Sequence, residues 1–585
     1  MVMGMNFFHS FRDEILKVLK TLENKGLLPE GLDYDKITTE PPRDPSHGDL
    51  ATNAAMMLSK PAGKNPRELG ELIADELKSV PFVESVSVAG PGFINLKLTP
   101  EFWYGQLIVI LDKKLAFGDS TMGLGEKINL EYVSANPTGP IHAGHGRVAI
   151  VADVLATLLE KVGYRVLREY YVNDAGGQAE KLAKSTYLRY CEALGRDIGE
   201  IPEGYYPGDY LIAVGEALAT RDGSKWLDLP EEQWLEPFRE FAVNAMMTMI
   251  RNDLALMGIT HEVFTSETEL HRTNAVEEAI DFLKKRDLVY RGTLEAPKGK
   301  GVENWEPREQ LLFRSTEFGD DSDRALQKAN GSWTYFAGDI AYHYDKYRRG
   351  YAQMINVWGA DHAGTVRRVT SAVKAITEGK GHLDVLLCQI VNFMENGKPF
   401  KMSKRSGNFI EVRDVIEKVG KDPYRFMMIS RKSDAHLDFD FKKVLEQTKD
   451  NPIFYIQYAH ARCHSVMRMA SETFPDWDKS PARSFDQLTD EDELQLIKLL
   501  AGWPRQVEIA ALAREPHRLC YYLYEIAAQF HMLWNKGKDN TLLRFILPQN
   551  RELTRARLAM LQAVAFVIGS GLQVFGITPV EEMRE

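Results

Sequence analysis

The sequence predicts an α/β protein with a central Rossmann-like parallel sheet, a small N-terminal α+β domain and an all-α C-terminal helical bundle. Three observations support this fold class. Strand-like and helical segments alternate from residue 127 onward, as they do in a parallel sheet. The segment before residue 120 mixes helical and strand patterns, whereas nearly everything after residue 436 has helical periodicity. The 585 residues suffice for two to four domains.

Residues 1–120 are predicted to form the N-terminal α+β domain. An amphipathic helical pattern, "FRDEILKVLKTLENKGLLP", comes first, and "VESVSVAGPGFINLKLT" later has the alternation of paired strands. The glycine-rich stretch "FGDSTMGLGEK" then marks a joint before the next domain.

The central domain is predicted to span residues 121–445. It begins with the strand "INLEYV", the loop "SANPTGPIHAGHGR", the helix "VAIVADVLATLLEKVG" and the strand "YRVLREYYVN". Long helical patterns around 175–290 predict an insertion. The strand-like "AQMINVWGAD" and "LLCQIV" then resume the sheet.

The remaining residues, 446–585, are predicted to form the helical bundle. Within it, residues 558–580 carry no charge and are long enough to cross a bilayer. Polar side chains at Gln562, Ser570 and Gln573, together with three glycines, interrupt this stretch. A buried C-terminal helix is therefore favoured over a membrane span.

Composition and charge narrow the function classes. The N-terminus has charges throughout and lacks the apolar run of a secretory signal, and four widely spaced cysteines fit buried thiols in a reducing cytosol. A cytoplasmic protein without a membrane partner is expected. The net charge of −11 does not exclude an RNA partner, because residues 401–432 hold nine Lys or Arg against four Asp or Glu.

The loop before the predicted helix, residues 134–147, has the features of an anion site. In a parallel sheet, ligands bind at the carboxyl ends of the strands, where a helix N-terminus offers unpaired N–H groups. His142 and His145 can both donate to phosphate oxygens there, and Gly144 lets a nucleotide approach the backbone. The alternative is that both histidines only cap the helix or fill the core.

A second basic motif lies in "GKPFKMSKRSGN", which contains Lys401, Met402, Ser403 and Lys404. Two ammonium groups on a loop can close over a triphosphate and neutralise charge as pyrophosphate departs. The alternative is a solvated basic loop. The pairing of this motif with the upstream HxGH favours nucleotide chemistry.

HxGH followed by KMSK, on a parallel sheet with a helical tail, resembles the class I aminoacyl-tRNA synthetases. Nine longer stretches of the sequence are similar to the arginyl-tRNA synthetase family. The similar stretches, in chain order, are "HGDLATNAA", "GPGFINLKL", "SANPTGPIHAGHGR", "YYVNDAGGQ", "YPGDY", "DIAYH", "WGADHAG", "KMSKRSGN" and "NPIFYIQYAHAR".

This resemblance implies a reaction and a set of site residues. L-arginine would be activated with ATP, accompanied by Mg²⁺, and transferred to the terminal ribose of tRNA(Arg). Neither a tightly bound cofactor nor a resident metal is expected, and a monomer is expected. The implied catalytic residues are His142, His145, Lys401 and Lys404, with Gly144, Met402 and Ser403 also at ATP. The implied arginine-binding residues are Glu131, Asn136, Tyr335, Asp339 and His362.

The helical tail is predicted to bind the tRNA. Tyr455 and Tyr458 lie three apart with Arg462 one turn on, and Phe530 and Trp534 lie four apart. Such faces suit stacking on unpaired bases, although aromatic pairs at helical spacing also occur in protein cores. The N-terminal domain is expected, by resemblance, to touch the outer corner of the tRNA.

Two other interpretations stay open on the sequence. One is a different HxGH nucleotidyltransferase or another class I synthetase. The other is a tRNA-binding paralogue without catalytic activity.

Overall fold

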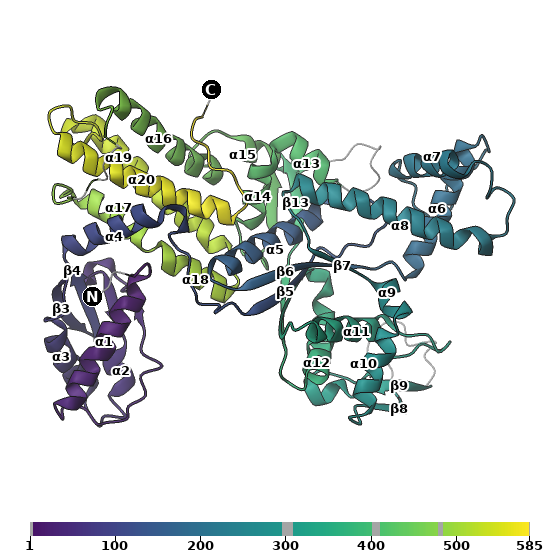
Figure 1. Ribbon diagram of the computed structural model, residues 1–585, viewed down its shortest axis with the longest axis horizontal. Helices are drawn as coiled ribbons and strands as arrows, with labels where there is room; N and C mark the ends of the chain where they lie inside the picture. The colour runs from purple at the N-terminus through teal and green to yellow at the C-terminus, as the bar shows by residue number, and fades with distance from the viewer. Residues whose placement is uncertain (1–3, 295–307, 401–409, 478–481, 483, 584–585) are drawn as a thin grey trace. The chain divides into compact units, whose positions relative to one another are not determined.

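The computed structural model describes residues 4–294, 308–400, 410–477, 482 and 484–583 (Figure 1). Its contacts divide the chain into two compact units. The sheet unit comprises residues 121–446 and 515–517, and the terminal unit comprises residues 1–120, 447–514 and 518–585. The first and last parts of the chain therefore fold together, a grouping that the sequence did not indicate.

A five-stranded parallel sheet, in the order β12-β11-β5-β6-β7, forms the centre of the sheet unit. The strands are β5 (Lys127–Tyr132), β6 (Arg165–Val172), β7 (Val263–Ser266), β11 (Gln353–Gly359) and β12 (His382–Cys388). The chain runs outward from β5 in one direction and later in the other, so the switch point lies between β5 and β11. Ligands bind at such a point, at the carboxyl ends of the strands.

Helix α5 (Ala143–Lys161) begins at this switch point and packs on β5, β6 and β11. Its residues "RVAIVADVLATLL" are apolar on nearly every face, and almost all of them are buried. A helix that is hydrophobic all round has to lie inside the protein. Two further helices, α13 (Val412–Val419) and α14 (Lys421–Ile429), cover it.

The predicted insertion consists of α6 (Gly177–Ala193), α7 (Tyr210–Asp222) and α8 (Glu231–Leu256), which share an aromatic core around Phe238. The predicted range of 175–290 extends too far, because β7 lies within it and pairs with β6 as the edge strand of the parallel sheet. With only four residues, β7 is too short to show a strand period.

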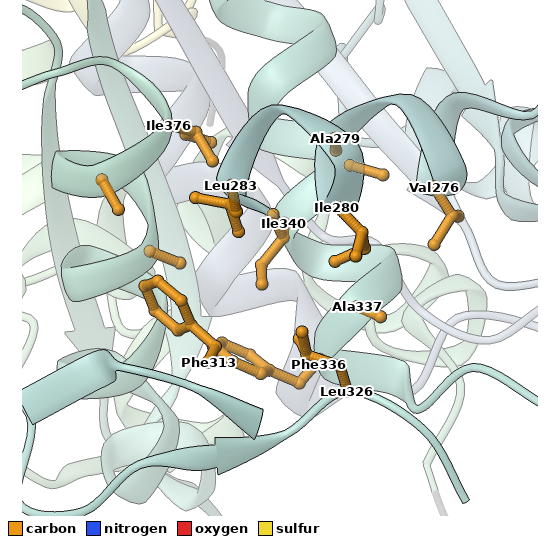
Figure 2. Packing of buried hydrophobic residues seen from close by; sticks show 13 residues of the cluster. Val276, Ala279, Ile280, Leu283, Phe313, Leu326, Phe336, Ala337, Ile340 and Ile376 are labelled. Atoms are coloured by element: carbon orange, nitrogen blue, oxygen red, sulfur yellow. The ribbon is translucent and has the colours of Figure 1, made fainter. Parts of the chain in front are cut away.

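A helical layer with its own core follows the insertion. It contains α9 (Glu267–Arg272), α10 (Ala275–Lys284), α11 (Tyr335–Arg348) and α12 (Val366–Ile376). Figure 2 shows side chains of α10, α11 and α12, among them Ile280, Ile340 and Ile376, packed with Phe313. Phe313 belongs to an antiparallel sheet formed by β8 (Val289–Thr293), β9 (Glu309–Phe313) and β10 (Arg324–Ala325). This core fixes α11 and α12 beside the switch point.

A small three-stranded sheet completes the sheet unit. It comprises β13 (Val391–Glu395), β14 (Lys398–Pro399) and β15 (Leu437–Asp440), and α15 (Phe441–Leu445) follows it. Lys401, Met402, Ser403 and Lys404 come directly after β14 and lie outside the described residues.

The N-terminal part of the terminal unit has the predicted α+β character. An antiparallel sheet in the order β1-β2-β4-β3 is covered by helices. Its elements are α1 (Phe7–Asn24), β1 (Thr39–Glu40), β2 (Leu50–Thr52), α2 (Ala54–Leu58), α3 (Pro66–Leu77), β3 (Val83–Ala89), β4 (Phe93–Leu98) and α4 (Pro100–Lys113). Short 3-10 helices along the chain are Pro45–His47, Lys114–Ala116, Ser315–Phe318, Ala360–Thr365 and Thr541–Leu543.

The C-terminal part is all-α, as predicted. Its helices are α16 (Pro452–Thr473), α17 (Glu491–Ala501), α18 (Trp503–Ala513), α19 (His517–Asp539) and α20 (Arg551–Val574). Among the described residues, α20 alone is long and apolar enough to cross a membrane, but 83% of its apolar window is buried. It packs on α4, α16 and α17 and is therefore a core helix, as predicted. All four cysteines are buried, as expected.

Candidate active site

A cavity of about 940 Å³ opens in the sheet unit beside the ends of β5 and β11. Seven residues singled out in the sequence line it: Glu131, Asn136, His142, His145, Tyr335, Asp339 and His362. Segments separated by some two hundred residues in the sequence thus meet at one site. Among the described residues, no group of three or more His, Cys, Asp or Glu side chains could hold a metal ion.

The chain turns sharply where β5 ends. Val133 and Ser134 have φ angles of 69° and 41°, in the left-handed region that a β-branched residue such as valine rarely adopts. In this conformation the Ser134 hydroxyl donates to Glu131 Oε1 at 3.2 Å and accepts from the Tyr171 N–H at 3.1 Å. The strained turn is therefore held in place by contacts at the cavity wall.

His142 is the N-cap residue of α5. Its Nδ1 accepts a hydrogen bond from the Gly144 N–H at 2.8 Å, so the proton of the neutral ring is on Nε2. A Cβ at position 144 would lie 2.8 Å from the same Nδ1, so this close approach favours glycine at position 144. The His142 and His145 rings are 5.9 Å apart, and both line the cavity at the positive end of the helix.

Both imidazoles are neutral donors near pH 7. Burial, reinforced by His145, lowers the pKa of His142. Burial also lowers the pKa of His145, although Asp361 opposes this effect. Together with the helix N-terminus they can hold phosphate oxygens without bringing a full positive charge.

The histidine loop is joined to the segment that follows residues 401–409. The Ala143 N–H donates to the Ile410 carbonyl at 2.7 Å, and the Val412 N–H donates to the Ile141 carbonyl at 3.0 Å. Asp253 of α8 accepts from the Ile141 N–H at 3.0 Å. The backbone around the first histidine is thus held from two sides.

Three carboxylates that line the cavity have no ion pair to Lys or Arg among the described residues. Asp361 is exposed and lies beside His362, whereas Asp339 on α11 and Glu267 at the start of α9 are largely shielded from solvent. Burial, reinforced by Glu131, raises the pKa of Asp339 to about 7. Burial, reinforced by Asp174, raises the pKa of Glu267 to about 7. Glu267 Oε2 is buried without a hydrogen-bond partner, so the pocket is prepared for a cation or a donor.

Glu267 was not among the sequence candidates. It lies against α11, since a Cβ on Gly338 would be 3.6 Å from Glu267 Oε1. The only local signal was the capping pattern "SETE", in which the Ser266 hydroxyl accepts from the Glu269 N–H at 3.1 Å. That pattern predicts a helix start but not which side chain faces a ligand.

Glu131 differs from these two carboxylates because it already has a cation partner. Lys346 Nζ donates to Glu131 Oε2 at 2.8 Å, and both side chains are buried. Lys346 also donates to Asn356 Oδ1 at 3.2 Å. Glu131 therefore contributes an oriented acceptor to the wall but little net charge.

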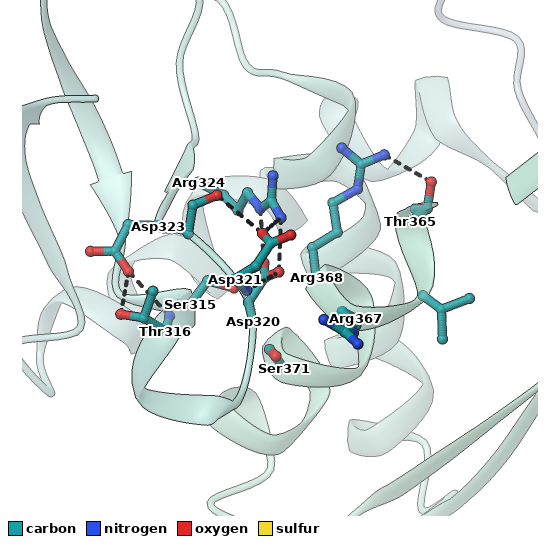
Figure 3. Close-up of polar contacts among 12 residues, drawn as sticks. Ser315, Thr316, Asp320, Asp321, Asp323, Arg324, Thr365, Arg367, Arg368 and Ser371 are labelled. Carbon is teal, nitrogen blue, oxygen red and sulfur yellow. Dashed lines mark hydrogen bonds and ion pairs between the residues drawn. The ribbon is translucent and has the colours of Figure 1, made fainter. Parts of the chain in front are cut away.

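Arg368 of α12 also lines the cavity and donates to Thr365 Oγ1 at 2.8 Å (Figure 3). Figure 3 also shows the hydrogen bonds from Arg324 to Asp320. Two of them measure 2.8 Å. Although burial opposes it, these bonds and one from Ser315 lower the pKa of Asp320 to about 2. This ion pair links Asp320, in the segment before β10, to Arg324, the first residue of β10. His362 is exposed at the cavity rim beside Asp361.

The predicted aromatic and cationic face of the helical part exists, but its members contact one another. The Arg462 guanidinium lies 4.1 Å from the Tyr458 ring centroid and 4.6 Å from that of Trp534. The Tyr455 ring is 4.4 Å from His531. The side chains of Tyr455, Tyr458, Arg462 and Trp534 are half-buried, whereas Phe530 is 0% exposed. Phe530 therefore belongs to the core and offers no face to a base.

A second cavity, of about 330 Å³, adjoins this cluster. Trp534 and Phe545 line it together with the cationic side chains of Lys538 and Arg544. The Trp534 Nε1–H is buried without a hydrogen-bond partner.

Three family profiles match consecutive parts of the chain. They are described as "Arginyl tRNA synthetase N terminal domain" (residues 9–98), "tRNA synthetases class I (R), catalytic domain" (residues 107–444) and "DALR anticodon binding domain" (residues 456–583). The chain is 56% identical to the arginine–tRNA ligase of Parvibaculum lavamentivorans, with 99% of this chain and 100% of that protein covered. It is 52% identical to that of Rhodospirillum rubrum, with the same coverage.

A solved structure has the same fold. The Thermus thermophilus arginyl-tRNA synthetase superposes with a TM-score of 0.72 at 19% identity, covering 98% of this chain and 100% of that one. A parallel sheet with histidines at the switch-point helix and an all-α C-terminal part is the architecture of the class I aminoacyl-tRNA synthetases. Within that class, the chain belongs to the arginyl-tRNA synthetase family. It is therefore an aminoacyl-tRNA ligase rather than a paralogue without catalytic activity.

Proposed function

We propose that the 940 Å³ cavity joins L-arginine to ATP and then to tRNA(Arg), with the guanidinium held between Asp339 and Glu267. One observation carries this assignment: two shielded carboxyl groups with no ion pair to Lys or Arg among the described residues lie in the same cavity as the two histidines. A planar guanidinium can satisfy two carboxylates at once through charge-assisted hydrogen bonds. Glu131, Asn136, Tyr335 and His362 complete the proposed arginine site.

In the first step, the arginine carboxylate attacks the α-phosphate of ATP, and pyrophosphate leaves. His142 donates through Nε2, and His145 and the N-terminus of α5 stabilise the charge that builds on the phosphate. We assign neutralisation of the departing pyrophosphate to Lys401 and Lys404, and further ATP contacts to Gly144, Met402 and Ser403. Mg²⁺ bound to ATP would add charge neutralisation.

In the second step, the terminal ribose hydroxyl of the tRNA attacks the arginyl carbonyl and AMP leaves. No covalent enzyme intermediate is required, because the mixed anhydride is already activated. The side chains named above therefore act by positioning and by electrostatic stabilisation.

We assign tRNA binding to the helical part, residues 446–585, through Tyr455, Tyr458, Arg462 and Trp534. The 330 Å³ cavity supports this assignment, because a base entering it would meet the Trp534 Nε1–H, while Lys538 and Arg544 could hold a phosphate. Residues 1–120 are proposed to contact the outer corner of the tRNA. We further propose that the chain acts as a monomer in the cytoplasm.

The test is charging of tRNA by the purified chain with each amino acid in turn. Arginine alone should be attached, and attachment should require ATP. Pyrophosphate exchange with and without tRNA would show whether activation needs the tRNA. Charging with another amino acid, or none with arginine, would overturn the proposal.

A further inference from the structure

The insertion contributes two tyrosines to the wall of the active-site cavity. Tyr206 and Tyr210 both line it; Tyr206 lies in the loop between α6 and α7, and Tyr210 is the first residue of α7. Neither residue is used by the chemistry described above. Both are half-buried, so part of each ring is open to the cavity.

Tyr210 is fixed by the histidine loop. Its hydroxyl donates to the Thr138 carbonyl at 2.7 Å, four residues before His142. A Cβ on Gly139 would lie 2.9 Å from the Tyr210 hydroxyl, and one on Gly208 would lie 2.1 Å from the ring. The Tyr210 side chain therefore packs closely against the backbone of both glycines.

Tyr206 meets the same threonine. Burial raises the pKa of Tyr206, and a hydrogen bond with the Thr138 side chain opposes this rise. The Tyr206 N–H also donates to Ser185 Oγ at 2.9 Å, which ties the loop to α6. Within the described part of the chain, no aromatic ring stacks on Tyr206 or Tyr210. Both rings therefore line the cavity without an aromatic partner of their own among the described residues.

The proposed reaction brings three reactants to this cavity: arginine, ATP and the 3′ end of a tRNA. Its volume of about 940 Å³ lies near the upper end of the roughly 300–1,000 Å³ typical of a pocket for one small ligand. The histidines and the helix N-terminus account for the phosphates, and the carboxylates account for the guanidinium. The terminal base of the tRNA, an unpaired adenine, has no partner in this assignment.

We propose that Tyr206 and Tyr210 form the stacking subsite for the terminal adenine of the tRNA. The inference rests on the proposed function, since it presumes that the 3′ end enters the cavity. Aromatic rings bind unpaired bases through their faces. Because Thr138 connects these rings to His142, the base and the reacting phosphate are placed by the same loop.

The experiment uses the full-length chain and tRNA(Arg) in which 2-aminopurine replaces the terminal adenine. Fluorescence of this base is quenched when it stacks on a ring. The wild type and Tyr206→Phe should quench it, whereas Tyr206→Ala and Tyr206→Leu should lose most of the quenching. The KM for tRNA should rise roughly 5-fold or more in the last two variants, with the KM for ATP unchanged.

Tyr205→Ala is the matched control, because Tyr205 is the neighbouring tyrosine and does not line the cavity. It should behave as the wild type. Undiminished quenching in folded Tyr206→Leu would overturn the proposal, as would a raised KM for ATP with an unchanged KM for tRNA, which would place the adenine of ATP on these rings. Failure of the wild type to charge tRNA with arginine would instead count against the proposed function.

Discussion

Lys346 Nζ lies 2.8 Å from Glu131 Oε2, and both side chains are buried. Lys346 is on α11, the helix that also presents Asp339 to the cavity. Helix α11 thus neutralises the carboxylate of Glu131 through Lys346 and also supplies the carboxylate of Asp339, which has no Lys or Arg partner among the described residues. The pairing leaves Asp339 and Glu267 as the less exposed acidic groups for a cationic substrate, since Asp361 is largely open to solvent.

Replacing Lys346 with Met should destabilise the fold by about 3–5 kcal/mol, because it leaves the buried Glu131 charge unmatched. Urea denaturation would measure the loss. Adding Glu131→Gln to the variant should recover more than about 1 kcal/mol, since the two side chains are in contact. Additive effects of the two substitutions would show that the pair is not coupled.

Asp339→Asn tests the arginine assignment. Removing one charge from a desolvated pair typically costs about 3–5 kcal/mol, so kcat/KM for arginine should fall by two to three powers of ten or more. ATP binding should barely change. Citrulline, which is neutral and nearly isosteric, should be rejected by the wild type and less strongly by the variant.

The control for this experiment is Asp345→Asn. Asp345 is on the same helix, pairs with Arg349 at 2.8 Å and does not line the cavity. Its removal should leave arginine kinetics unchanged. Near-normal charging by Asp339→Asn would mean that Asp339 is not the guanidinium partner.

The sequence predicted the parallel sheet and α5 because their signals are local. The strand "INLEYV" is a short β-prone run and the segment after His142 is a long apolar run, and both formed where predicted. The all-α tail and the buried α20 were predictable for the same reason, since their helical patterns are long.

What could not be predicted depends on contacts between distant segments. Glu267 joins the cavity because β7 places α9 beside α11, and neither the four-residue strand nor its register has a sequence signature. The sequence pattern places Lys346 as an ordinary charge on an amphipathic helix. Only the structure shows its contact with Glu131, which is 215 residues away. Phe530 and Trp534 lie four residues apart on one helix, so the sequence pattern does not distinguish them. Only the structure shows that Phe530 is in the core and that Trp534 is half-exposed.

Arginine binding should release protons below about pH 7. Burial raises the pKa of both Asp339 and Glu267 to about 7, and pairing with a guanidinium requires their ionised forms. Affinity for arginine should therefore rise between about pH 5 and 7 and level off near pH 8. Calorimetry in buffers of different ionisation enthalpy would count the protons, and Asp339→Asn should release fewer.

The same shifts determine how the ligand-free protein depends on pH. A carboxyl group with a raised folded pKa keeps a proton that the unfolded chain has already lost. Its contribution to the free energy of unfolding therefore decreases as pH rises from its ordinary pKa towards about 7. Without arginine, Asp339→Asn should consequently be less sensitive to pH in this range than the wild type. An identical pH dependence of the two melting temperatures would contradict the assigned shift.

His142 has two roles that substitution can separate. His142→Ala removes both the N-cap acceptor and the Nε2–H donor, so it should lose about 1 kcal/mol of stability and roughly 10²-fold in the rate of activation. His142→Asn keeps an N-cap acceptor and should retain the melting temperature while still losing rate. His145→Ala, which removes no cap, should lose rate to a similar extent. A lowered melting temperature with an unchanged rate would mean that the histidines are structural.

Tyr458→Ala tests RNA binding by the helical part. Base stacking on an aromatic ring is worth roughly 1–3 kcal/mol, and the loss should appear in tRNA affinity measured at fixed salt. Arg462 would lose one of its two rings but would still lie over Trp534, so the helix should remain folded. Affinities for arginine and ATP should not change. Phe530→Leu provides the contrast: its ring is 0% exposed, so the substitution should lower the melting temperature and leave tRNA affinity nearly intact. If Tyr458→Ala unfolds the protein and Phe530→Leu weakens tRNA binding alone, the two aromatic residues have the opposite roles to those assigned here.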